Sequence, residues 1–292
     1  MNATFQRIAV LDGAGLSPVA LAALRELSRD GLIVQGRWPD SPPDEWADVD
    51  ALVAGWRDHL PASALAAFPK LRHIALRGTS TDRIDLAYAK RHGIDVQPIF
   101  NYGDTGTAEF VIEQLLRGVR DFRFEGGDTA RELAGRTLGL LGYGAVARRV
   151  AVIASALGMR VVHHTPSGSG KDPREPSTWV PAADLLSRAD MISLHTPAYL
   201  RVLSADDLGL IRDDALVVIT TLGLPAHVDD FDSWQRARAG RVVLDQCAVQ
   251  GVSSPLAEIP GVDVAGVFAA RTEESIERAE RAVLDGLRRA AR

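Results

Sequence analysis

Residues 140–151 are the part of the sequence whose residue types and spacing point most directly to chemistry. They read LLGYGAVARRVA, so an apolar strand runs into a glycine-rich turn and a helix-forming stretch follows. A dinucleotide loop needs a tight turn at its first glycine, room for the diphosphate at its second, and then a small residue. Gly142, Gly144 and Ala147 meet these needs, and the N–H groups that begin the helix would face the anion. A tight strand-to-helix turn that binds nothing has the same spacing, so the pattern is a hypothesis. The predicted nucleotide contacts in this turn are Gly142, Tyr143, Gly144, Ala145 and Val146.

The strand after this loop indicates which dinucleotide is bound. An NAD site usually places an acidic residue about 20 residues after the loop, where it binds the ribose 2′-hydroxyl. Here the strand RVVHHT ends at His163, His164 and Thr165 without an acid, and Lys171 follows. Because no carboxylate repels a 2′-phosphate, we predict NADP as the cofactor, with NAD as the alternative, and Thr165 and Lys171 as its contacts. In the other interpretation the two histidines only fill space beside the adenine, and Lys171 is solvated.

Composition excludes several classes of protein. The 292 residues are 46% hydrophobic and 24% charged, which is typical of a soluble globular chain. The formal net charge of −5 and the lack of a long apolar run predict no nucleic-acid partner and no membrane partner. The single cysteine, Cys247, excludes an intrachain disulfide and a thiolate-rich metal site, so we predict no metal. This cysteine usage fits a reducing, cytoplasmic setting.

The alternation of short apolar runs with helical patterns predicts the α/β class. We expect two doubly wound parallel-sheet domains of the Rossmann or flavodoxin type. Residues 1–100 form the first, completed by a C-terminal helix over 272–292, and residues 101–271 form the second, which contains the glycine loop. The strands predicted in the first domain cover 7–12, 32–38, 51–56, 72–78 and 94–99.

A family resemblance extends over most of the chain. Residues 132–166, ELAGRTLGLLGYGAVARRVAVIASALGMRVVHHTP, resemble the cofactor core of the D-2-hydroxyacid dehydrogenase family. Further segments resemble that family in the same order: LRHIALRGTSTDRIDLAYAKRHGIDV, TAEFVIEQLL, ADMISLHTP, VVLDQCAVQG and VDVAGVFAARTEE. The resemblance implies a substrate domain, a Rossmann-type cofactor domain, a cleft between them, a small-molecule substrate and a homodimer. It places His195 beside the cofactor and Asp245 at the nicotinamide amide. The cofactor contacts that it implies are His195, Thr196, Pro197, Thr221 and Asp245.

The catalytic arginine, glutamate and histidine of that family have no counterparts here. The arginine's place falls at Leu222 or Leu224, the glutamate's at Gln250 and the histidine's at Val267. In the family the arginine holds the substrate's carboxylate and the histidine exchanges the hydroxyl proton. General acid–base help is worth about 10²–10⁴-fold in rate, so we do not expect ordinary 2-hydroxyacid dehydrogenase activity.

Three polar residues remain as candidates for catalysis. Arg77, at the end of a strand in the first domain, is a possible replacement anchor for the substrate, or else part of a surface ion pair with Asp82 or Asp85. His227 lies in a loop that is longer than its family counterpart, and a solvated loop histidine is the other interpretation. Gln250 can donate a hydrogen bond but is no useful proton source.

These observations favour an NAD(P)-dependent oxidoreductase with a changed active site, acting on a carbonyl, an imine or an activated alkene. Two alternatives stay open. The loss of three catalytic groups also fits a non-catalytic nucleotide-binding sensor or partner subunit. The second alternative is a lyase or isomerase that uses bound NAD(P) internally, and nothing in the sequence selects it.

Overall fold

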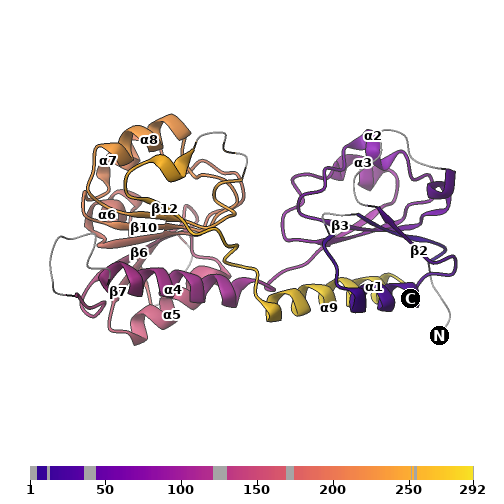
Figure 1. Cartoon of the computed structure of the whole chain (residues 1–292), viewed down its shortest axis with the longest axis horizontal. Helices are drawn as coiled ribbons and strands as arrows, with labels where there is room; N and C mark the ends of the chain where they lie inside the picture. The colour runs from indigo at the N-terminus through magenta and orange to yellow at the C-terminus, as the bar shows by residue number, and fades with distance from the viewer. Residues whose placement is uncertain are drawn as a thin grey trace. The chain divides into compact units, whose positions relative to one another are not determined.

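The chain divides into two compact units, each built around a parallel sheet. The computed structural model describes residues 5–11, 14–35, 44–120, 130–168, 174–250, 252 and 255–291. One unit consists of Met1–Tyr102 with Glu273–Arg292, and the other is Gly103–Thr272. Both sheets have helices on both faces, so the predicted α/β class with two parallel-sheet domains is confirmed (Figure 1). The cleft between the two domains stays a prediction.

The first unit has the strand order β2-β1-β3-β4-β5 with every pair parallel, as in flavodoxin-like folds. Its strands are β1 (Ile8–Leu11), β2 (Leu32–Gln35), β3 (Ala51–Gly55), β4 (His73–Arg77) and β5 (Asp95–Pro98). Its helices are α1 (Pro18–Arg25), the 3-10 helix η2 (Asp44–Asp48), α2 (Ala62–Leu65), α3 (Leu86–Arg91) and α9 (Glu273–Ala290). Helices α1 and α9 cover one face of the sheet, and α2 and α3 cover the other (Figure 1). Residues 36–38 of the second predicted strand lie outside the described residues.

The last helix of the chain is attached to the first unit through the start of α1. Glu280 accepts hydrogen bonds from the backbone N of Ser17 at 2.6 Å and from its hydroxyl at 2.7 Å. The same hydroxyl accepts from Ala20 N, so Ser17 caps α1 and binds α9 at once. Ala279, Val283 and Leu287 of α9 are buried against the sheet, which explains why a helix at the C-terminus belongs to the N-terminal fold.

The second unit has the strand order β12-β11-β10-β9-β6-β7-β8, again all parallel, which is the Rossmann arrangement extended by one strand. Its strands are β6 (Thr137–Leu141), β7 (Arg160–His164), β8 (Thr178–Trp179), β9 (Met191–Leu194), β10 (Leu216–Ile219), β11 (Val242–Leu244) and β12 (Val262–Val264). Its helices are α4 (Asp104–Arg120), α5 (Ala145–Ala156), α6 (Ala182–Arg188), α7 (Ala205–Leu210), α8 (Val228–Arg236) and the 3-10 helix η3 (Leu256–Glu258). Helices α4 and α5 cover one face, and α6, α7 and α8 cover the other (Figure 1). The strand order reverses between β6 and β9, which makes this pair the switch point where such folds bind their ligands.

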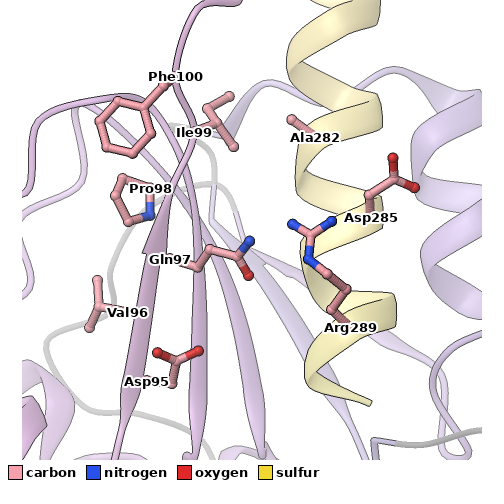
Figure 2. A pocket seen from close by; sticks show the side chains of 9 residues that line it. All are labelled: Asp95, Val96, Gln97, Pro98, Ile99, Phe100, Ala282, Asp285 and Arg289. Carbon is pink, nitrogen blue, oxygen red and sulfur yellow. The ribbon is translucent and has the colours of Figure 1, made fainter. Parts of the chain in front are cut away.

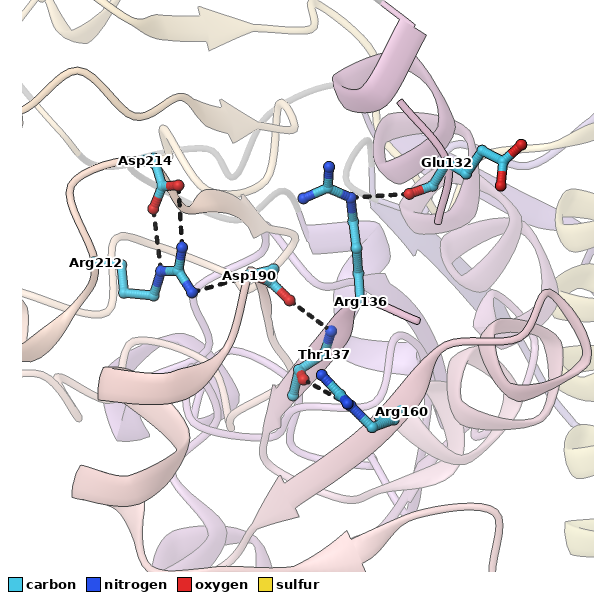
Figure 3. Close-up of polar contacts among 7 residues, drawn as sticks. All are labelled: Glu132, Arg136, Thr137, Arg160, Asp190, Arg212 and Asp214. Atoms are coloured by element: carbon cyan, nitrogen blue, oxygen red, sulfur yellow. Dashed lines mark hydrogen bonds and ion pairs between the residues drawn. The ribbon is translucent and has the colours of Figure 1, made fainter. Parts of the chain in front are cut away.

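Opposite the glycine loop, the amino ends of β6, β9 and β10 are joined by a network of polar contacts (Figure 3). Asp190 accepts a hydrogen bond from Thr137 N at 2.8 Å and pairs with Arg212 at 3.2 Å. Arg212 also forms two bonds of 3.1 Å with Asp214, and this pairing lowers the pKa of the Asp214 carboxyl. This network holds together the amino ends of three neighbouring strands. No predicted site residue that the structure describes lies at this end of the sheet.

We therefore expect Asp190→Ala to lower the free energy of unfolding by about 1–3 kcal/mol, because it leaves the partly buried Thr137 N–H without its acceptor. Urea unfolding followed by circular dichroism measures the change. The control is Asp82→Ala at an exposed residue of the first unit, which should change stability by less than about 0.5 kcal/mol. Equal effects of the two substitutions would contradict the role assigned to Asp190.

Candidate functional site

The candidate site lies at the carboxyl ends of β6 and β9 in the second unit. Gly142 follows β6 directly and His195 follows β9. The two strand ends are joined by the hydrogen bond from His195 N to Leu141 O at 2.8 Å. The glycine loop therefore starts at the switch point, where side chains of neighbouring loops converge.

The two glycines of the loop have different structural roles. Gly142 has a φ of 92°, and a Cβ on this residue would overlap the carbonyl oxygen of His195. Gly144 begins α5 with an ordinary φ of −85°, and a Cβ there would meet no atom within 4 Å. Gly142 thus permits the turn, and Gly144 leaves open space in front of the helix. The N–H groups of Ala145 and Val146 lie in the first turn of α5, so this turn fits a bound diphosphate.

Tyr143 turns its side chain away from the open side of the loop. Its ring stacks on His163 with 3.7 Å between centroids, and the residue is 5% exposed. Its hydroxyl donates to Glu175 at 3.0 Å, and Glu175 also pairs with Arg148, whose guanidinium lies over the Tyr143 ring. Burial, with the neighbouring Glu175, raises the pKa of Tyr143 to about 12. The predicted contact at Tyr143 is therefore restricted to its backbone, and the side chain supports the loop from below.

Glu175 is a site residue that sequence reasoning missed. It lies 32 positions after Tyr143, beyond β7, and is brought to the loop by the segment that leads into β8. No spacing rule links it to a glycine loop. The only signal was that Tyr143 and Arg148 form a polar pair on an otherwise apolar turn and helix.

The end of β7 carries no carboxylate among the described residues. Thr165 is buried, with its hydroxyl 2.9 Å from Ser167 Oγ and its carbonyl accepting from Trp179 Nε1 at 3.2 Å. His163 is fully buried and lies 2.9 Å from Ser177 Oγ. His163 therefore belongs to the buried residues below the loop. Lys171, the other predicted contact, lies outside the described residues.

His195 is held as a neutral side chain beside the loop. Its Nε2 lies 3.0 Å from Ser193 Oγ, and burial lowers its pKa to about 4. Thr196 follows, with a buried hydroxyl that makes no hydrogen bond to any residue the structure describes. Pro197 is exposed at the start of the next loop. A buried hydroxyl without a partner is costly, so Thr196 Oγ1 fits a site that a ligand completes.

Asp245 and Thr221 are both engaged with backbone groups of their own loops. Asp245 accepts from Cys247 N at 2.9 Å, Ala248 N at 3.0 Å and Ala269 N at 3.1 Å. Burial raises the pKa of its carboxyl, and these N–H groups oppose the rise. The Thr221 hydroxyl donates to Gly223 O at 2.9 Å. Asp245 therefore ties the end of β11 to the segment after β12, and the neighbouring Cys247 is half-buried.

The positions to which the resemblance assigns the family's catalytic residues lie around this edge of the second unit. Leu224 is buried in the core, and Leu222 is half-buried in the loop after β10. The Gln250 side chain donates a hydrogen bond to Gln246 O at 3.2 Å. The backbone N of Gln246 donates to the carbonyl oxygen of Val267, a residue that is 52% exposed.

The structure does not gather the three candidate catalytic residues in one unit. Gln250 belongs to the second unit and lies in the segment that follows β11. His227 directly precedes α8 with an exposed side chain that does not cap the helix. Arg77 is the last residue of β4 in the first unit. Its guanidinium lies close to Gly15, because Nη1 is 3.9 Å from the position that a Cβ on Gly15 would take.

A groove of about 710 Å³ lies elsewhere, between β5 and α9 of the first unit (Figure 2). Asp95 and Gln97 line it from the strand, and Asp285 and Arg289 line it from the helix. None of the predicted site residues borders it. In the described part of the chain no cluster of three potential metal ligands occurs, and no described helix is long and apolar enough to cross a membrane.

The two glycines give a matched pair of substitutions. We expect Gly142→Ala to destabilise the protein by about 3 kcal/mol, because it adds both a strained φ and an overlap with His195. Gly144→Ala should change stability by less than about 1 kcal/mol yet weaken dinucleotide binding at least tenfold, because its Cβ enters the open space. Thermal unfolding and nucleotide titration measure the two effects. A Gly144→Ala variant with undiminished affinity would refute the assignment.

The pKa of His195 predicts a pH dependence of stability. Since the folded pKa is about 4 and the ordinary value 6.5, the unfolded chain binds the proton more tightly. The contribution of neutral His195 to stability is therefore complete above pH 6.5 and is lost as the pH falls towards 4, by at most about 3 kcal/mol for this half-buried residue. His195→Gln should flatten this part of the urea-unfolding profile, whereas His59→Gln at an exposed position should not. The same slope in all three proteins would contradict the assignment.

Comparison with known proteins agrees with this geometry. Residues 111–230 match the model of the D-isomer specific 2-hydroxyacid dehydrogenase NAD binding domain. (S)-Sulfolactate dehydrogenase of Chromohalobacter salexigens is 29% identical over 269 residues, which span 84% of this chain and 85% of that protein.

Solved structures show the same fold over nearly the whole chain. D-Lactate dehydrogenase of Aquifex aeolicus, complexed with NAD and lactic acid, has a TM-score of 0.82 and 23% identity, covering 96% of this chain and 94% of that one. An acyclic imino acid reductase in complex with NADPH and D-Arg has a TM-score of 0.80 and 20% identity, covering 97% and 96%. Together with the glycine loop at the switch point of a Rossmann sheet, the matches support the resemblance to the family of D-isomer specific 2-hydroxyacid dehydrogenases.

Proposed function

We propose that this protein is an NAD(P)-dependent oxidoreductase with a non-standard active site, which reduces a small carbonyl, imine or activated alkene. Residues 103–272 bind the dinucleotide in this proposal, and the first unit supplies the substrate-type domain. The observation that carries the proposal is the glycine loop at the switch point, with open space at Gly144 and the unpartnered hydroxyl of Thr196 beside it.

The chain's own residues have separate roles in this site. The loop from Gly142 to Val146 binds the diphosphate through backbone N–H groups, and Thr196 Oγ1 gains a hydrogen-bond partner from the bound nucleotide. His195, neutral and bonded to Ser193, lines the site without serving as a proton source near neutral pH. Asp245 offers a remaining lone pair to the nicotinamide amide. When bound, the reduced nicotinamide supplies a hydride to the substrate.

The lack of a carboxylate at the end of β7 supports NADP rather than NAD. Thr165 occupies that end, and the nearby Glu175 is engaged by Tyr143 and Arg148. A 2′-phosphate therefore meets no unpaired negative charge from these residues. A protein of the same fold was solved with NADPH, which shows that the fold accommodates this nucleotide.

The catalytic positions of the family separate this proposal from ordinary 2-hydroxyacid dehydrogenase activity. Leu222 or Leu224, Gln250 and Val267 stand where the resemblance places the arginine, glutamate and histidine. A 2-keto acid needs a cation for its carboxylate, and these side chains offer none. The same observation favours the second candidate, a catalytically inactive dinucleotide-binding sensor or partner subunit. We also propose a homodimer in a reducing, cytoplasmic setting, in line with the family and the single cysteine.

Nucleotide titration tests the proposal directly. With the whole chain, we expect dihydronicotinamide fluorescence to report NADPH binding at least about tenfold tighter than NADH binding, since a 2′-phosphate is accepted and no ribose-binding acid is present. Thr165→Asp, which restores an acid at the end of β7, should reverse this preference.

The possible outcomes are distinct. Lack of binding of either nucleotide at millimolar concentration would overturn the dinucleotide site and the oxidoreductase together. A clear preference for NADH would overturn only the NADP assignment. Tight binding without turnover of any carbonyl, imine or alkene tested would favour the sensor or partner subunit.

A further inference from the structure

Tyr199 has an unusual backbone conformation in the loop after β9. Its φ is 55°, in the left-handed region that bulky residues rarely adopt. The strain is held by a hydrogen bond of 2.7 Å from Tyr199 N to Leu222 O, in the loop after β10. Strained residues of this kind persist where the surrounding structure fixes them, and they concentrate at functional sites.

The ring of Tyr199 fills the place that a side chain at residue 223 would take. Gly223 has a φ of 79°, and a Cβ on it would lie 2.9 Å from Tyr199 Cδ1. Gly223 stands between Leu222 and Leu224, the two positions to which the resemblance assigns the missing arginine. The aromatic ring therefore packs against the loop segment to which the resemblance assigns the arginine.

The ring is also accessible from this edge of the sheet. Tyr199 is 43% exposed, and its hydroxyl makes no hydrogen bond to any residue that the structure describes. Three other polar side chains of the site are engaged: His195 with Ser193, Thr221 with Gly223 O, and Asp245 with three backbone N–H groups. Tyr199 thus presents an available O–H group four residues after the predicted cofactor contact His195, on a loop that is hydrogen-bonded to the loop after β10.

We infer that Tyr199 is a catalytic residue that contacts the substrate's carbonyl oxygen and replaces the lost arginine and histidine, an inference that rests on the proposed function. In the reduction, the carbonyl carbon accepts a hydride from the reduced nicotinamide and the C=O π bond breaks. The Tyr199 O–H bond breaks as its proton passes to the carbonyl oxygen, which gives an alcohol. Tyr199 then regains a proton from water, so the nicotinamide is oxidised and the carbonyl reduced by two electrons.

The same geometry narrows the substrate class. A phenol is a neutral donor and cannot balance a carboxylate as a guanidinium does. The substrate is therefore an uncharged aldehyde or ketone rather than a 2-keto acid. Methylglyoxal and pyruvate are both methyl ketones, but methylglyoxal carries an aldehyde next to the ketone and pyruvate carries a carboxylate there. They therefore form a matched pair of probes.

The experiment compares the whole wild-type protein with Tyr199→Phe and Tyr88→Phe, using NADPH with methylglyoxal or pyruvate. Tyr199→Phe keeps the ring against Gly223 and removes only the hydroxyl, whereas Tyr88 is stacked on His92 in the first unit. We expect kcat/KM for pyruvate to be at least about 100-fold below that for methylglyoxal. For methylglyoxal, Tyr199→Phe should lower kcat at least about tenfold, with KM and NADPH affinity within about threefold. The solvent deuterium isotope effect on kcat should change in this variant alone.

Each outcome decides a different point. Turnover of methylglyoxal with unchanged kcat in Tyr199→Phe overturns the role of Tyr199 and leaves the proposed function intact. A preference for pyruvate overturns the substrate class. If the wild-type protein binds NADPH but reduces neither probe, both the inference and the proposed reductase activity on these carbonyls are overturned.

Discussion

The contact between Gly142 and the backbone of His195 is the constraint on which the candidate site depends. It lies at the carboxyl ends of β6 and β9, which the hydrogen bond from His195 N to Leu141 O joins and where the order of the sheet reverses. A side chain at residue 142 would force these strand ends apart, and the start of α5 would move with them. The open space at Gly144 and the unpartnered Thr196 hydroxyl both lie next to this contact, so one backbone approach sets the position of the whole loop.

Support for the loop comes from a buried polar cluster rather than from apolar packing alone. Tyr143 stacks on His163, and Glu175 joins the Tyr143 hydroxyl to Arg148. Because the hydroxyl and the carboxylate satisfy each other, the cluster fixes one orientation of the loop relative to α5 and β8. The same contacts engage the carboxylate of Glu175, and this is the physical basis of the proposed preference for NADP.

The two edges of the second sheet differ in their chemistry. At the amino edge Arg212 pairs with both Asp190 and Asp214 (Figure 3). At the carboxyl edge the loops carry an unpartnered hydroxyl at Thr196 and a strained, accessible Tyr199. Paired groups stabilise the fold, whereas strain and unpartnered polar groups cost free energy that a ligand can recover. This division fits the proposed placement of the site at the carboxyl edge.

The sequence by itself determined the α/β class and the position of the glycine loop, because these depend on local periodicity and on glycines at fixed spacing. The resemblance to the family rests on longer segments in the same order, and the absence of its arginine, glutamate and histidine stays a prediction from that resemblance. Only the tertiary structure brought Glu175 under the loop, turned the Tyr143 side chain inward and set Tyr199 against Gly223. These contacts join residues of different loops, and their geometry follows from strand order and packing, which no spacing along the chain encodes.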